Sequence, residues 1–154
     1  MLELVLRPDA CRRDRFDPGH FTASAFVLAP ERDAILLIFH RKLGIWVQPG
    51  GHVDEGDLSV RAAAEREVAE EVGIRGLELA ASEEALFDVD IHPIPARPGE
   101  PAHEHFDVRF SFVAPSRRFV ASDEVAAARW VSLSEVGTVA SDESVQRAVR
   151  KLRG

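Results

Sequence analysis

Three glutamates crowd one short stretch of the sequence. Glu67, Glu70 and Glu71 stand at positions i, i+3 and i+4, which in an α-helix places their carboxylates within roughly 100° of one face. Like charges at this spacing destabilise a helix by roughly 0.2–0.5 kcal/mol per pair, so a cation is expected over the face. Carboxylate oxygens suit Mg²⁺ or Mn²⁺. The spacing therefore predicts a divalent-metal site.

The neighbouring residues predict how these glutamates are held. Pro49, Gly50 and Gly51 predict a turn whose backbone can approach a ligand closely. Ser59 is a good helix cap, and residues 60–72 carry an alanine-rich run with an apolar stripe at helical spacing. Gly73 predicts the end of this helix. The stripe would pack inward, leaving the carboxylates at the edge of the buried surface.

The rest of the chain alternates strand-like and turn-like segments. Residues 142–152 form a second amphipathic pattern, which predicts a C-terminal helix, and a short helix is expected to start at residues 134–136. Strands mixed with two substantial helices indicate an α/β fold. Short apolar runs predict the strands Leu2–Leu6, Phe21–Leu28 and Ala34–Phe39 as a hairpin, Leu77–Ala80, Leu86–Ile91, His103–Val113 and Ala128–Leu133.

Candidate substrate-binding residues lie outside the helix. In the strand expected at residues 103–113, alternation places His103, His105 and Arg109 on one face, which is rich in groups that could contact a substrate or a metal. Glu104 interrupts the apolar face of the same strand and is a weaker candidate for an additional ligand or base. Arg41 directly follows another expected strand and could contact phosphate, although a solvated loop explains it as well.

Composition bounds the class of protein. The 154 residues suit one domain, 1–154, and the single cysteine, Cys11, favours a reducing compartment, the cytoplasm. The apolar runs are shorter than the roughly 18 residues that span a bilayer, so no membrane association is expected. A net charge of −7 disfavours sequence-independent nucleic-acid binding. A small phosphorylated partner, such as a nucleotide, remains compatible once metal ions neutralise the acids. The sequence leaves open whether the chain acts as a monomer or a homodimer.

The sequence resembles the Nudix hydrolases, whose box reads Gx5Ex7REUxEExGU, with U an aliphatic residue. Two departures concern one position: Asp57 stands where the family usually has Glu, and eight residues instead of seven separate it from Arg66. The extra residue must be absorbed at the start of the helix, which puts the reach of Asp57 in question. The matching residues are Gly51, Arg66, Glu67, Val68, Glu70, Glu71, Gly73 and Ile74.

The resemblance implies a fold, an activity and residue roles. The fold would be an α/β/α sandwich around a mixed sheet. The activity would be metal-dependent hydrolysis of a nucleoside diphosphate linked to another moiety, through attack of water on phosphorus. Glu67 and Glu71 would bind Mg²⁺ or Mn²⁺ together with a backbone carbonyl near Gly51, Glu70 would be a ligand or the general base, and Arg66 would orient the glutamates. A nucleoside triphosphate and a nucleotide sugar both fit as substrate.

Three alternatives remain in view. A catalytically weak Nudix domain could bind a nucleotide and act as a sensing module. A Nudix-fold isomerase would need a catalytic cysteine in a strand, whereas Cys11 lies in the N-terminal loop region. A cupin-type metal pair could form from His103 and His105, but the later ligands of that pattern have no obvious counterparts in the sequence.

Overall fold

The computed structural model describes residues 1–81 and 86–154. The expected helix at residues 60–72 is present with the predicted ends: the Ser59 side chain accepts a hydrogen bond from the Ala62 N–H at 3.0 Å, and Gly73 adopts φ 67°. The elements in chain order are α1 (Leu2–Val5), β1 (Gly19–Leu28), β2 (Ala34–His40), β3 (Ile45–Val47), β4 (Gly50–His52), α2 (Val60–Val72), β5 (Glu78–Leu79), β6 (Asp88–Ile94), β7 (His103–Val113), β8 (Ala128–Ser132), a 3₁₀ turn (Val136–Thr138) and α3 (Glu143–Arg153).

The described strands form one mixed sheet. Its main path runs β3-β2-β1-β7-β5, with β4 paired to β1, β6 to β7 and β8 to β2. The central pair, β1 and β7, is parallel over ten residues, from Gly19 opposite Glu104 to Leu28 opposite Val113, and the other pairs are antiparallel. The expected hairpin forms only at its turn, where Leu28 pairs with Ile35, and the opposite edge of β2 pairs with β8 from Ala34 to Ile38.

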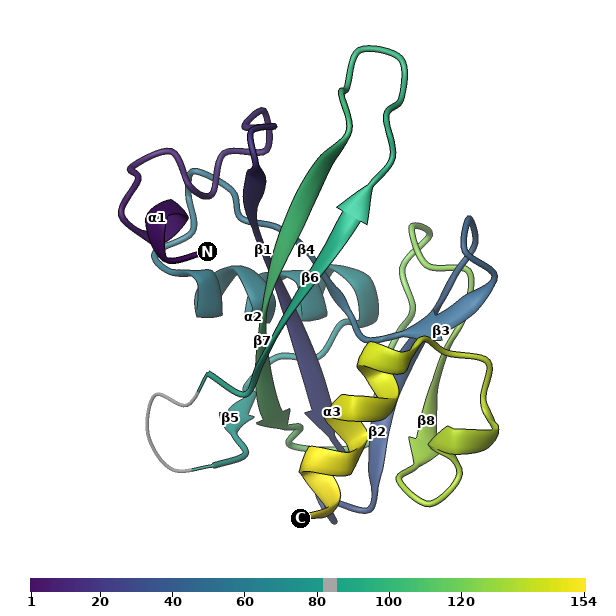
Figure 1. The fold of residues 1–154 in the computed structure, drawn as a ribbon. Coiled ribbons are helices and arrows are strands. Elements are labelled where there is room, and N and C mark those ends of the chain that lie inside the picture. The colour runs from purple at the N-terminus through teal and green to yellow at the C-terminus, as the bar shows by residue number, and fades with distance from the viewer. Residues whose placement is uncertain (82–85) are drawn as a thin grey trace.

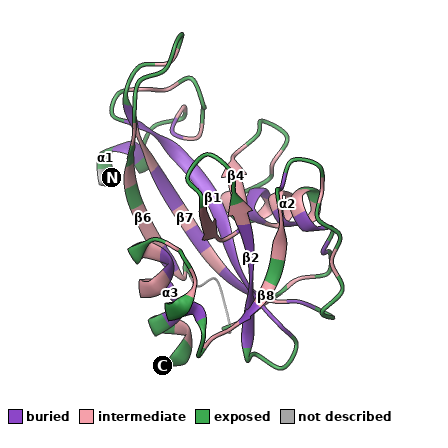
Figure 2. Ribbon diagram, turned by 90° about the vertical axis from the view of Figure 1, so that its right-hand side faces the viewer, coloured by how far each residue is buried: buried purple, intermediate pink, exposed green. Residues whose placement is uncertain are grey.

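Helices α2 and α3 cover opposite faces of this sheet (Figures 1 and 2). Strand β1 is buried along its whole length, and alternate residues point to opposite faces of a strand. Ala23 and Ala25 pack in the cluster under α2, whereas Phe26 and Leu28 pack in the cluster under α3. The α/β fold predicted from the sequence, with helices on both sides of a mixed sheet, is confirmed.

The strand expected at residues 2–6 is not present, so this prediction is wrong. Residues 2–5 form the short helix α1, whose first turn is closed by hydrogen bonds from the Leu4 and Val5 N–H groups to the Met1 carbonyl. Leu4 packs inward, against Phe21 and Phe106, while Val5 is 56% and Leu6 85% exposed. Over residues 1–81 and 86–154, no helix has the length and apolarity to cross a membrane.

Candidate active site

Two glycines of β4 bring backbone against the acidic face of α2. A Cβ atom at Gly51 would overlap the carboxylate of Glu67, and one at Gly50 would overlap Ser24 on β1. The Gly50 N–H donates a hydrogen bond to Glu71 Oε2 at 3.2 Å. Glycine at position 50 therefore lets β4 pair this closely with β1, and glycine at position 51 leaves room for the Glu67 carboxylate against β4.

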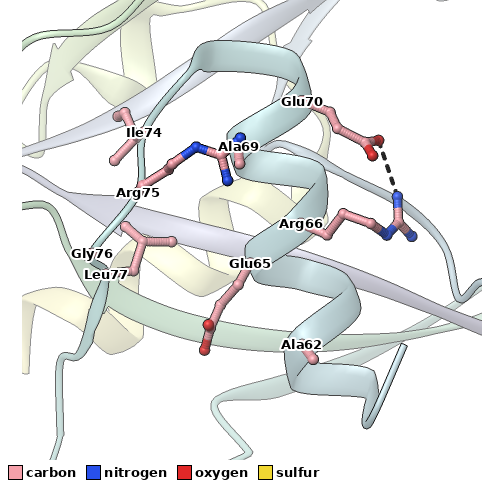
Figure 3. A pocket seen from close by; sticks show the side chains of 9 residues that line it. All are labelled: Ala62, Glu65, Arg66, Ala69, Glu70, Ile74, Arg75, Gly76 and Leu77. Atoms are coloured by element: carbon pink, nitrogen blue, oxygen red, sulfur yellow. Dashed lines mark hydrogen bonds and ion pairs between the residues drawn. The ribbon is translucent and has the colours of Figure 1, made fainter. Parts of the chain in front are cut away.

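Arg66 forms hydrogen bonds with the acids that lie beside the contact between β4 and α2. Its guanidinium donates to Glu67 Oε1 at 3.1 Å and to Glu70 Oε2 at 3.0 Å, and the second contact is drawn in Figure 3. It also donates to the His52 carbonyl on β4 at 2.9 Å. One side chain thus ties the helix to the strand that carries Gly51, as expected for a residue that orients the glutamates.

Asp57 also contacts Arg66, through both of its carboxylate oxygens. Its two oxygens accept bonds from Arg66 Nε and Nη2, both at 3.0 Å, and its side chain is 7% exposed. These bonds lower the pKa of Asp57. Leu58 is 98% exposed directly before the helix cap, in the connection where the extra residue of the box is expected. The shorter Asp57 reaches Arg66, so its contact in this structure is with the orienting arginine.

The electrostatics of the site fit a bound cation. Burial, followed by repulsion from Glu67, raises the pKa of Glu71 to about 8. Burial also raises the pKa of Glu67. Both carboxylates would hold their charge more readily beside a divalent ion, and carboxylate and carbonyl oxygens are the ligands that Mg²⁺ and Mn²⁺ prefer. The donor set Glu67, Glu70, Glu71 and the Gly51 backbone is chemically suited to such an ion.

A hollow of about 370 Å³ adjoins the helix. It lies between α2 and the segment Ile74–Leu77, and Arg66 and Glu70 line it, but Glu67 and Glu71 do not. In Figure 3 the Glu70 carboxylate turns toward Arg66, while Glu65 projects away from this pair. The hollow thus borders the exposed side of the acidic cluster and does not include its buried glutamates.

The structure places the other candidate residues in three different surroundings. Arg41 lies in the exposed turn between β2 and β3, and Glu104 is half-buried where β7 begins. Arg109 is 2% exposed, and it bonds Asp107 at 2.9 Å and the Ser144 hydroxyl at 2.8 Å on the α3 side of the sheet. It therefore does not join the glutamates, which face the sheet from α2. Its predicted substrate contact stays untested, but its donors are engaged in the interior.

His103 and His105 belong to a cluster of histidines. The ring centroids of His20 and His105 lie 4.8 Å apart, and those of His52 and His105 lie 5.3 Å apart. Burial lowers the pKa of His52 to about 4 and that of His105 to about 3, so both are neutral at pH 7. The sequence singled out His103 and His105 but missed His20 and His52. The register that sets His20 opposite His105 is the missing signal.

Comparison with known proteins assigns the family. Residues 18–152 match the family described as NUDIX domain, and the chain therefore belongs to the Nudix family. This membership confirms the resemblance seen in the sequence and the predicted enzyme class, a Nudix-type pyrophosphohydrolase. None of the curated proteins compared with the chain is significantly similar to it.

Solved structures share the fold at low sequence identity. A hydrolase of the NUDIX family from Clostridium perfringens is 24% identical with a TM-score of 0.63, over 87% of this chain and 96% of that one. The E. coli dihydroneopterin triphosphate pyrophosphohydrolase is 22% identical with a TM-score of 0.65, over 85% and 92%. A C. elegans Ap4A hydrolase is 20% identical with a TM-score of 0.63, over 86% and 94%. At these identities the likeness concerns the fold.

Proposed function

We propose that residues 1–154 form one hydrolase domain that cleaves a phosphoanhydride bond in a nucleoside diphosphate linked to another moiety, such as a nucleoside triphosphate or a nucleotide sugar. The observation that carries this proposal is the folded box itself, with Glu67 and Glu71 of α2 pressed against Gly50 and Gly51 of β4. The single cysteine supports a cytoplasmic setting.

Each residue of the site would have its own role in the reaction. A bound Mg²⁺ or Mn²⁺ would neutralise phosphate charge and make water a better nucleophile. Glu67, Glu71 and the Gly51 backbone would hold the ion. Glu70, whose side chain is 54% exposed, would serve as a further ligand or as the base that takes the proton of the attacking water. Arg66 would keep the glutamates in place.

The names of the structural neighbours support the substrate class. One neighbour is named for the hydrolysis of dihydroneopterin triphosphate and another for that of Ap4A. A third, the NUDIX domain of Shewanella oneidensis NrtR, was solved with ADP ribose, at 18% identity and a TM-score of 0.61. All three compounds carry linked phosphates, which supports testing nucleotides and their conjugates first.

A substrate panel tests the proposal. Nucleoside triphosphates, nucleotide sugars and dinucleoside polyphosphates are incubated with the protein and either Mg²⁺ or Mn²⁺, and the products are separated by ion exchange. We expect metal-dependent release of a nucleoside monophosphate from at least one compound. Saturable nucleotide binding without turnover on any compound would instead favour the alternative, a catalytically weak Nudix domain that acts as a sensing module.

A further inference from the structure

Five of the six histidines of the chain meet at one end of the sheet. They come from four strands and are His20 of β1, His52 of β4, His92 of β6, and His103 and His105 of β7. Among the described residues, one group of three His, Cys, Asp or Glu side chains offers ligand atoms that all lie within 4.8 Å of one another: His20, His52 and His105. The glutamates of α2 are not part of this group.

Strand alternation separates this cluster from the acidic site. Gly51 of β4 faces α2, because a Cβ atom there would meet Glu67. The next residue, His52, must point to the opposite face, and its ring lies 5.2 Å from that of His20. The histidines and the glutamates therefore occupy opposite sides of the same short strand.

The hydrogen bonds of the histidines leave ring nitrogens free. His20 Nδ1 lies 3.0 Å from the Arg15 carbonyl, and His103 Nδ1 lies 2.8 Å from the Pro101 carbonyl. A carbonyl can only accept, so each Nδ1 carries the proton and each Nε2 keeps its lone pair. Within the described chain, the buried Nε2 atoms of His20, His103 and His105 have no hydrogen-bond partner. A backbone carbonyl that fixes the ring in this way is typical of metal-ligating histidine.

We propose that His20, His52 and His105 bind a divalent transition-metal ion of the Zn²⁺ type, at a site separate from the glutamates. Neutral imidazole nitrogens favour Zn²⁺ and its neighbours over Mg²⁺. Three imidazoles fill three of the four tetrahedral positions that Zn²⁺ prefers. A hollow of about 200 Å³, lined by His52, Phe16 and Glu100 among others, adjoins the cluster at His52.

The ion would join the N-terminal segment to the sheet beside the acidic site. His20 holds the end of that segment through the Arg15 carbonyl, and the carbonyl of His52 accepts the Arg66 bond at 2.9 Å. Binding would thus immobilise the strand that carries Gly51. Because an ion that binds only the folded state stabilises it, Zn²⁺ should raise the melting temperature. This inference does not depend on the substrate class proposed above.

The test measures metal binding directly. Metal-stripped protein is titrated with Zn²⁺ by calorimetry in saturating Mg²⁺, and Co²⁺ is added separately to record the visible bands of a tetrahedral site. We expect one ion per chain, a rise in melting temperature and the Co²⁺ bands. His105→Ala and His52→Gln should each lose all three, whereas His40→Gln, at an exposed histidine outside the cluster, should keep them. Glu71→Gln should keep them too.

Two different histidine variants are used so that loss of Zn²⁺ binding can be told apart from misfolding. Both positions are half-buried. His105→Ala removes most of the side chain, whereas His52→Gln preserves most of its volume, and the melting temperature of each variant without metal reports its folding. Undiminished Zn²⁺ binding in a folded histidine variant would overturn the proposal, as would loss of binding in Glu71→Gln. Absence of Zn²⁺ binding to the wild-type protein would also overturn it. A failed substrate panel would leave these results unaffected.

Discussion

At the scale of single residues, Arg66 organises the acids of the candidate site. It bonds Asp57 twice and Glu67 and Glu70 once each. The hydrogen bonds with Asp57, followed by the negative charge of Glu67, raise the pKa of Arg66 above its ordinary value. Asp57 stands where the family box has Glu, and one extra residue separates it from Arg66, yet it forms the paired contact with the guanidinium. We therefore infer from this contact that Asp57 positions Arg66, and two predictions separate that role from metal binding.

The first prediction compares Asp57→Ala with Glu67→Gln. Loss of a side chain that positions a metal-site residue typically costs about 10- to 100-fold in activity, so we expect a loss of that size in kcat/KM for Asp57→Ala. Glu67→Gln removes a proposed ligand and should cost more. Steady-state kinetics at saturating Mg²⁺ measures both. An equal loss in the two variants would mean that Asp57 itself contacts the ion.

The second prediction concerns acid stability. Because Arg66 lowers the pKa of Asp57 below its ordinary value of 3.8, the ionised side chain stabilises the folded state above that pH and loses this contribution as the pH falls further. The wild-type protein should be more stable than Asp57→Asn at pH 7. Urea denaturation should show the gap narrowing as the pH falls below about 4. A gap independent of pH would rule out a charge effect.

At the scale of elements, the close approach of β4 to α2 creates the site. The third prediction is that Gly51→Ala sharply lowers turnover, because its methyl group would overlap the Glu67 carboxylate. Gly56→Ala is the matched control, since a Cβ atom there meets nothing within 4 Å. Kinetic assays on both purified variants provide the comparison. Equal activity of the two would show that β4 can shift without harm.

The elements differ in how far the sequence predicts them. Helix α2 has the predicted bounds because its cap, apolar stripe and terminal glycine are local signals that agree. Strand β7 likewise spans the predicted residues 103–113. Strand β4 could not be read from its three residues, Gly-Gly-His, which carry no strand propensity and are held by pairing with β1. The site thus depends on one element that local sequence predicts and one that only tertiary pairing defines.

At the scale of the whole molecule, a buried polar network connects the sheet to α3. Arg109 bonds Asp107 at 2.9 Å and lies 3.6 Å from Asp88. Asp107 in turn accepts a bond from the Ser24 hydroxyl at 2.7 Å, and Ser24 pairs with Gly50 in the sheet. The sequence places Arg109 on a polar strand face together with Asp107, but its other partners, Asp88 and Ser144, come from distant parts of the chain. Such contacts could not be predicted without the register of the strands.

The fourth prediction tests this structural role of Arg109. Arg109→Met would leave the buried Asp107 carboxylate without its cation, and breaking a buried ion pair costs about 3–5 kcal/mol of unfolding free energy. Arg117→Met removes the exposed pairs to Glu31 and Asp33 and should cost about 0–1 kcal/mol. Urea denaturation compares the two variants. A fully stable Arg109→Met protein with a raised KM would instead support the substrate contact predicted from the sequence.

The most direct test of the account as a whole is turnover by Glu71→Gln. Glutamine keeps the size of the side chain and suits a position whose burial disfavours charge, but it removes an anionic ligand from the proposed metal site. On the best substrate of the panel, with Mg²⁺ or Mn²⁺, we predict a loss of several powers of ten in kcat with the melting temperature retained. Glu65→Gln, on the same helix and paired with Arg61, should keep its activity. Unchanged turnover in Glu71→Gln would contradict the assignment of this site.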